Sequence, residues 1–247
     1  MIQGPDDLAG LWDGIYVENN IYEMWSVVQE VQTVSPLHTI LEVGVALGGT
    51  LRLWERLLQE RGSRGLLIGI DAAVDTEGRL TGRITCPCGP GWKTPVRTPL
   101  GGNWKVLERR GNILRLESDQ LVYCVIGDST DPMITAQVFS LLEQREIDLY
   151  FHDGAHYGRT PVLDFVNYGK ALRVGGLLCA ADVGNCDPKV GPLVLDSGIQ
   201  QLYRFLPEPK RKASPDVYGM GLWKRPVLGP FPDVSSLLAL PELQGVV

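Results

Sequence analysis

Residues 41–50 read Leu41-Glu42-Val43-Gly44-Val45-Ala46-Leu47-Gly48-Gly49-Thr50, and this stretch decides the fold. A short apolar run with β-branched residues, 39–43, leads into it, as expected of a buried strand. Glycines then recur between Gly44 and Gly49, and apolar residues at helical spacing continue to residue 60. The predicted order is strand, tight glycine turn and helix. Such a turn lets a ligand lie against bare backbone at a helix N-terminus.

The spacing of the glycines indicates what kind of ligand this turn accepts. A dinucleotide-binding turn reads G-x-G-x-x-G, whereas three residues separate Gly44 from Gly48 here. The acidic Glu42 also precedes the first glycine by two residues, and a carboxylate there disfavours a pyrophosphate and favours a cationic group. The pattern therefore disfavours a nicotinamide oxidoreductase. A glycine turn taken alone also fits an ordinary connection between strand and helix.

Further apolar runs alternate with helical patterns along the rest of the chain. Strands are predicted at 66–71, 121–126, 147–153 and 177–181. Helices are predicted to begin at Asp131-Pro132 and Thr160-Pro161, where an N-cap residue precedes a proline in the first turn. This alternation predicts an α/β fold, a doubly wound and mostly parallel sheet with helices on both faces.

Acidic residues stand where the predicted strands end, and in such sheets ligands bind beyond the carboxyl ends of the strands. Asp71 comes 27 residues after Gly44, close to the interval at which doubly wound folds place an acid on a ribose. Five carboxylates along one edge predict a site for polyhydroxyl groups, a cation or a metal; they are Glu42, Asp71, Asp128, Asp153 and Asp182.

The composition limits the classes of protein to which the chain can belong. With 247 residues, 44% hydrophobic and 21% charged, the chain is long enough for one large α/β domain. A net charge of −6 does not indicate general binding to nucleic acids. No stretch approaches the roughly 20 consecutive apolar residues that a helix needs to span a bilayer. The first ten residues lack the pattern of a secretory signal. Five cysteines, two of them in predicted buried strands, favour reduced thiols in the cytoplasm.

Three parts are expected along the chain. Residues 1–35 form an N-terminal helical segment, 36–225 the α/β domain, and 226–247 a Pro-rich tail. The Gly- and Pro-rich stretch 73–118 interrupts the rhythm after the second strand, so we expect a loop insertion over the carboxyl edge of the sheet. Cys86 and Cys88 lie in it, but no second pair with zinc-ligand spacing accompanies them. The N-terminal helix or the tail offers a surface for a homo-oligomer.

Several phrases together resemble class I S-adenosylmethionine-dependent methyltransferases across about residues 39–181. The closest likeness is to the small-molecule O-methyltransferase group that includes cephalosporin-hydroxylase-like and macrocin-type enzymes. The phrases are Leu41-Glu-Val-Gly44, Gly69-Ile-Asp71, Gly127-Asp128-Ser129, Ile147-Asp-Leu-Tyr-Phe-His-Asp153-Gly-Ala-His156 and Leu172-Arg-Val-Gly-Gly-Leu177. The resemblance implies a Rossmann-like fold and S-adenosylmethionine as cofactor. It implies that Glu42, Gly44 and Gly48 line the methionine side, that Asp71 takes the ribose hydroxyls, and that Asp128 and Ser129 flank adenine.

Metal-dependent members of that class hold Mg²⁺ with an acid after the fourth strand and another after the fifth. Asp153 and Asp182 match those positions. The third ligand, Asn or Asp, usually follows the second acid directly, where this chain has Val183, with Asn185 two residues further on. Hard cations bind about six oxygens, so the departure disfavours the metal. His156 stands where those enzymes place a base, and an imidazole of ordinary pKa near 6.5 accepts a hydroxyl proton at neutral pH. Asp153 would contact both cofactor and acceptor.

The resemblance thus implies an enzyme that methylates a hydroxyl of a small molecule, with or without Mg²⁺. The alternative is an accessory protein that binds S-adenosylmethionine or a nucleotide without transferring methyl. An intact Asp153-x-x-His156 favours the enzyme, and Val183 favours the accessory protein. The acceptor stays open, because the segments that would shape its pocket match no motif.

Overall fold

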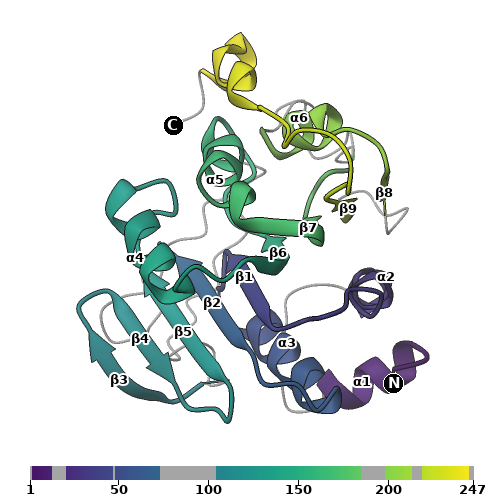
Figure 1. Ribbon diagram of the computed structural model, residues 1–247, viewed down its shortest axis with the longest axis vertical. Coiled ribbons are helices and arrows are strands. Elements are labelled where there is room, and N and C mark those ends of the chain that lie inside the picture. Colours follow the sequence, from purple (N-terminus) through teal and green to yellow (C-terminus); the bar gives the residue numbers. More distant parts are fainter. Residues whose placement is uncertain are drawn as a thin grey trace, which may run out of the picture.

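One mixed sheet runs through the middle of the molecule (Figure 1). The computed structural model describes residues 2–12, 21–46, 48–72, 104–184, 198–212 and 219–244. The strands of the described chain are β1 (Thr39–Val43), β2 (Leu66–Asp71), β3 (Val106–Arg110), β4 (Ile113–Leu116), β5 (Leu121–Ile126), β6 (Ile147–His152), β7 (Leu172–Ala180), β8 (Lys210–Lys212) and β9 (Gly221–Lys224). They form one sheet in the order β3-β4-β5-β2-β1-β6-β7-β9-β8.

The five central strands, β5-β2-β1-β6-β7, are all parallel. Val43 pairs with Ile70 on one side and His152 on the other, so β1, β2 and β6 end at the same level. The order reverses at β1, since β2 lies on one side of it and β6 on the other. Doubly wound sheets open a crevice at such a point. The predicted doubly wound, mostly parallel α/β fold is confirmed.

Helices cover both faces of the sheet, and each face has its own hydrophobic core. One core includes Trp54, whose ring meets Phe151 edge-on with 5.5 Å between centroids. Because β1 and β2 are buried on both faces, their sequences are apolar apart from Thr39, Glu42, Gly69 and Asp71. The helices are α1 (Pro5–Trp12), α2 (Ile21–Val31) and α3 (Gly49–Glu60) on one face, and α4 (Pro132–Leu142), α5 (Thr160–Tyr168) and α6 (Gly198–Phe205) on the other.

The two predicted helix starts differ in outcome. Asp131 caps α4 by accepting a hydrogen bond from the Met133 backbone N–H at 2.7 Å, as its position before a proline predicts. Thr160 is instead the first residue of α5, and Arg159 precedes it without a side-chain cap. Its expected capping role is wrong.

The sheet margins also differ from the expectation. Within the predicted loop insertion 73–118, β3 and β4 form an antiparallel hairpin that extends the sheet beyond β5. The loop expectation is therefore wrong for these residues, because Leu114 and Leu116 are buried and hold the hairpin to the core. Residues 73–103 of that insertion lie outside the described residues. At the other margin Lys210–Lys212 is the edge strand β8, and edge strands commonly carry such charges.

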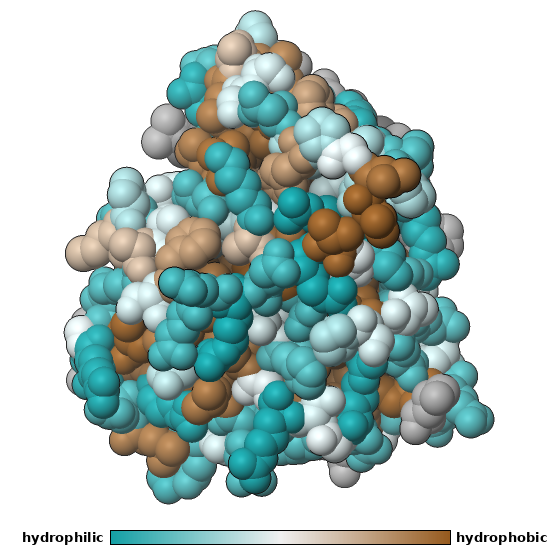
Figure 2. Space-filling view, in the orientation of Figure 1, coloured by the Kyte–Doolittle hydropathy of each residue, from teal (hydrophilic) through white to brown (hydrophobic). Residues whose placement is uncertain are grey.

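The tail packs against α5 through two short 3₁₀ turns, Ser235–Ala239 and Pro241–Leu243. Val234, Leu237 and Leu243 are buried, so the apolar side of the tail belongs to the core. Figure 2 shows a face on which hydrophilic residues predominate and apolar ones are scattered in small patches. Among the described helices, none has both the length and the apolar character that crossing a bilayer requires.

Candidate active site

The turn after β1 brings bare backbone to the end of β6. The Gly44 N–H donates to the Ile70 carbonyl at 2.9 Å, and the Asp153 N–H donates to the Val43 carbonyl at 2.8 Å. Gly44 has a φ of +88°, and a Cβ there would lie 2.1 Å from the Asp153 carbonyl oxygen. No side chain fits, so only glycine permits β1 and β6 to end this close together.

Asp71 ends β2 and is tied to the same turn. Its Oδ2 accepts a hydrogen bond from the Ala46 backbone N–H at 2.7 Å, and the Asp71 side chain is largely buried. Ala46 has a φ of +44°, a left-handed conformation that a non-glycine residue keeps only where its surroundings hold it. The acid expected to take ribose hydroxyls therefore lies against the glycine turn and also shapes it.

Glu42 contributes a buried carboxyl to the face of β1 that α3 covers. Burial, and then the negative charges of Asp153 and Asp71, hold the pKa of this carboxyl well above its usual range. Its Oε2 has no hydrogen-bond partner among the described residues. A cation arriving beside Glu42, Asp71 and Asp153 would relieve this repulsion, so the ends of β1, β2 and β6 favour a positively charged ligand.

The residues after β5 lie next to Asp71, because the Gly127 N–H donates to the Asp71 carbonyl at 3.0 Å. Asp128 is exposed, and its Oδ1 accepts from the backbone N–H and the hydroxyl of Thr130, each at 2.8 Å. Ser129 is buried, and its carbonyl accepts the Tyr168 hydroxyl at 2.7 Å. Gly48, with a φ of +73°, is the N-cap of α3. Four of the five predicted acids thus end or follow a parallel strand at the same edge of the sheet; they are Asp71, Asp128, Asp153 and Asp182.

His156 lies between two of the predicted acids. Its Nδ1 is 2.8 Å from Asp182 Oδ2, and its Nε2 is 3.5 Å from Asp153 Oδ1, an ion-pair distance without hydrogen-bond geometry. Asp182 follows β7 with a φ of +59°. The left-handed conformation of a non-glycine residue beside a site is a strained arrangement that the surrounding structure must stabilise.

The two carboxylates change the expected protonation of His156. Burial alone would lower the pKa of the imidazole, but Asp153 and Asp182 outweigh it and raise the pKa to about 10. The ring therefore carries a proton at neutral pH. The expected value near 6.5 is wrong for this arrangement, because the sequence does not show that both acids face one ring.

A sequence profile described as a methyltransferase domain matches residues 41–183, more than half of the chain. The chain belongs to the methyltransferase domain family. The matched region begins within β1 and ends just after β7, so it holds the glycine turn and all five strand-end acids. No curated protein matches the sequence.

Solved structures share the fold at low identity. One is the MycE methyltransferase of the mycinamycin biosynthetic pathway, solved with Mg, SAH and mycinamycin VI, with a TM-score of 0.52 and 13% identity. The match covers 93% of this chain, which spans 57% of the MycE chain. Another is the calicheamicin methyltransferase CalS11, with a TM-score of 0.50 and 14% identity, covering 89% of this chain and 90% of that one.

The methyltransferase domain does not present a fitted magnesium site in the described residues. No group of three His, Cys, Asp or Glu side chains there could hold a metal ion. Val183, at the expected third-ligand position, is buried in the core, and its backbone N–H donates to the Gly219 carbonyl at 3.2 Å. Asp153 and Asp182 instead share the His156 imidazole. Cys86 and Cys88 lie outside the described residues.

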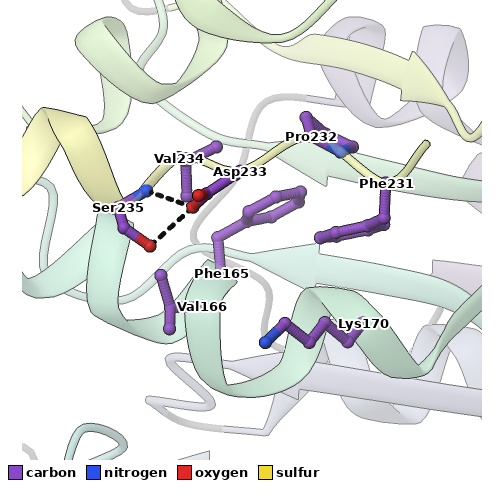
Figure 3. A pocket seen from close by; sticks show the side chains of 8 residues that line it. All are labelled: Phe165, Val166, Lys170, Phe231, Pro232, Asp233, Val234 and Ser235. Carbon is purple, nitrogen blue, oxygen red and sulfur yellow. Dashed lines mark hydrogen bonds between the residues drawn. The ribbon is translucent and has the colours of Figure 1, made fainter.

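Two cavities lie away from this edge. One of about 360 Å³ lies between α5 and the tail, where Phe165 and Phe231 stack with 5.2 Å between centroids (Figure 3). Another of about 340 Å³ lies between the β3–β4 hairpin and the end of α4. Neither is lined by a predicted site residue, so the cavities do not mark the candidate active site.

Two side chains that support the glycine turn, Trp104 and Arg52, were not predicted from the sequence. Trp104 donates its indole N–H to the Gly48 carbonyl at 2.8 Å, and the Arg52 guanidinium lies 3.6 Å from the centre of its ring. Trp104 is far from Gly48 along the chain, so no local pattern connects the two. The amphipathic pattern of α3 predicts that Arg52 is a polar position, but it does not predict the stacking of Arg52 on Trp104.

Gly44→Ala tests whether the close approach of β1 and β6 requires glycine. Gly62→Ala is the matched control, because Gly62 also has a positive φ, +61°, but a Cβ there meets nothing within 4 Å. We expect Gly62→Ala to cost about 1–2 kcal/mol of unfolding free energy from backbone strain. Gly44→Ala should cost about 1–3 kcal/mol more than Gly62→Ala, because the Cβ at position 44 would meet backbone atoms. Urea unfolding measures both, and equal losses would contradict the close approach.

His156→Gln tests the charge on the ring. A folded-state pKa of about 10, above the ordinary 6.5, means that the protonated ring stabilises the fold. That contribution is complete below pH 6.5 and is lost as the pH rises through about 10. The difference in unfolding free energy between wild type and His156→Gln should therefore be largest near pH 6 and shrink steadily toward pH 10. A difference that does not change with pH would contradict the assignment. The exposed His38 allows a control substitution.

Proposed function

We propose that this protein transfers the methyl group of S-adenosylmethionine to a hydroxyl of a small molecule. One observation carries the proposal: in a methyltransferase domain, the turn that begins with the bare backbone of Gly44 lies beside Glu42, Asp71 and Asp153. A ligand with a cationic amino-acid part and a ribose suits that combination of bare backbone and negative charge.

Each residue has a proposed role at the cofactor. Glu42 stabilises the positive charge of the methionine part, and the Gly44–Gly48 turn leaves space for it. Asp71 accepts hydrogen bonds from the ribose hydroxyls, since a carboxylate can accept two at once. Asp128 and Ser129 flank the adenine, because they follow β5, the strand next to β2.

The acceptor side is proposed to be Asp153, His156 and Asp182. The bound cofactor supplies an activated methyl group, so the protein must hold the acceptor oxygen in line with it and remove the hydroxyl proton. Asp153 and His156 follow β6, and Asp182 follows β7, the next strand of the sheet. The neutral ring of His156 would take the proton, and the two carboxylates would stabilise the imidazolium that forms.

Magnesium has no step in this proposal. MycE was solved with Mg, but in the described part of this chain two carboxylates share an imidazole and lack a third ligand. The accessory-protein alternative is favoured by one observation, the protonated ring, which leaves no ready base at neutral pH. Methyl transfer by the purified protein would decide against the accessory-protein alternative.

Partners and compartment follow from the same proposal. A small-molecule acceptor fits the chemistry, and the net charge of −6 supports no role in nucleic-acid binding. Cys124 and Cys179 are buried and free, which supports a reducing compartment such as the cytoplasm. A homo-oligomer that forms through the N-terminal helix or the C-terminal tail is also part of the proposal.

Calorimetric titration tests the cofactor. We expect S-adenosylmethionine and S-adenosylhomocysteine to bind and the nicotinamide dinucleotides not to bind. Asp71→Ala should weaken binding by about 1.5–3 kcal/mol, the scale of hydrogen bonds to a charged group. Asp71→Asn, which keeps an oxygen for the Ala46 N–H, should lose less. Asp233→Ala is the control, since Asp233 lies in the tail, where its carboxylate accepts hydrogen bonds from the backbone N–H and the hydroxyl of Ser235. Wild-type protein that binds no S-adenosyl compound would overturn the proposal.

The pH dependence of transfer tests His156 as the base. Because the ring loses its proton only near pH 10, kcat should rise from pH 7 to pH 10 when no divalent metal is added. His156→Ala should be slower by roughly 10²–10⁴ at the upper end and should lose the slope. A flat profile in the wild type, or a variant with the same slope, would reassign proton removal to another group.

A further inference from the structure

A buried indole holds the first peptide of α3. Trp104, 5% exposed, donates its Nε1–H to the Gly48 carbonyl at 2.8 Å, and the Arg52 backbone N–H donates to the same oxygen at 3.1 Å. The peptide that joins Gly48 to Gly49 is planar and trans, so its carbonyl and its N–H point in opposite directions. Fixing the carbonyl therefore fixes the direction of the Gly49 N–H, one of the N-terminal donors that a helix leaves without an intrahelical partner.

The indole is itself held from the side of α3. The Arg52 guanidinium lies 3.6 Å from the ring centroid and pairs with Glu55 Oε2 at 2.6 Å. The Glu55 side chain is 3% exposed, and its Oε1 accepts hydrogen bonds from Gln59 and from the Ser118 hydroxyl. A charged group stacked on an indole and fixed by a buried carboxylate restrains the ring in one orientation.

Side chains from both sides of segment 73–103 are hydrogen-bonded to this turn. Before the segment, Asp71 accepts the Ala46 N–H at 2.7 Å. After it, Trp104 donates to the Gly48 carbonyl. The turn that faces the carboxyl edge is thus hydrogen-bonded from both sides by side chains that lie far away in the sequence.

We propose that Trp104 is a positioning residue for the cofactor: it holds the Gly48–Gly49 peptide so that the start of α3 faces the bound ligand. This rests on the proposed function, because it needs a ligand at the Gly44–Gly49 turn. Trp104 touches no reacting atom in this account. It acts through the backbone, and Arg52 and Glu55 act through Trp104.

A second indole supplies a matched control. Trp223 in β9 is fully buried and donates its Nε1–H to the Pro207 carbonyl at 3.0 Å, near the opposite margin of the sheet. Replacing either tryptophan with phenylalanine removes one indole hydrogen bond to a backbone carbonyl and keeps an aromatic ring. The two variants should therefore lose comparable stability, and only Trp104→Phe should affect the turn.

The experiment compares the two variants in cofactor affinity and in amide exchange. Calorimetric titration with S-adenosylhomocysteine should show that Trp104→Phe weakens binding by about two- to tenfold, the range for one hydrogen bond. Trp223→Phe should bind as the wild type does. In the unliganded protein, Trp104→Phe should speed amide exchange several-fold at residues 48–52, and Trp223→Phe should not.

The outcomes separate this inference from the proposed function. Wild-type protein that binds no S-adenosylhomocysteine overturns the cofactor role of both, and the exchange comparison still decides whether Trp104 holds the turn. Wild-type affinity retained in Trp104→Phe overturns the positioning role and leaves the proposed function standing. Should Trp104→Phe fail to fold, Arg52→Met takes its place, since it frees the ring and keeps the indole N–H. Affinity must then fall about twofold, and unchanged affinity overturns the inference.

Discussion

The close approach of Gly44 to the Asp153 peptide is the constraint on which the candidate site depends. A Cβ at Gly44 would lie 2.1 Å from the Asp153 carbonyl oxygen, so backbone alone forms the floor of the candidate site between the ends of β1 and β6. Acidic side chains then surround that floor, because each neighbouring strand ends in or before a carboxylate. Bare backbone next to several acidic groups suits a cationic ligand and disfavours a pyrophosphate.

The acidic groups at this edge are partly neutralised within the protein itself. The buried Glu42 carboxyl has a raised pKa, and Asp153 and Asp182 hold His156 in its protonated form. In the unliganded protein the imidazolium thus offsets part of the negative charge that a cationic ligand would otherwise meet. The proposed cofactor side lies at the ends of β1 and β2, and the proposed acceptor side, with the paired His156, follows β6 and β7.

The centre of the sheet could be predicted from the sequence because its strands are mainly apolar and most of them end in, or are followed by, Gly or Asp. Glu42, Asp71 and Asp153 could be placed at one edge for the same reason, since parallel strands end together. The β3–β4 hairpin could not, because only Leu114 and Leu116 bury in it and glycines and prolines precede it. Trp104 and the raised pKa of His156 depend on contacts between residues far apart in the chain, and no local pattern encodes them.

A crystal structure with S-adenosylhomocysteine tests the central claim most directly. The account predicts that the amino-acid part lies over the Gly44 turn beside Glu42, with the ribose hydroxyls within hydrogen-bond distance of Asp71. The sulfur should then face the side of the crevice that holds Asp153 and His156. A ligand bound at another edge, or with its ribose away from Asp71, would contradict the account.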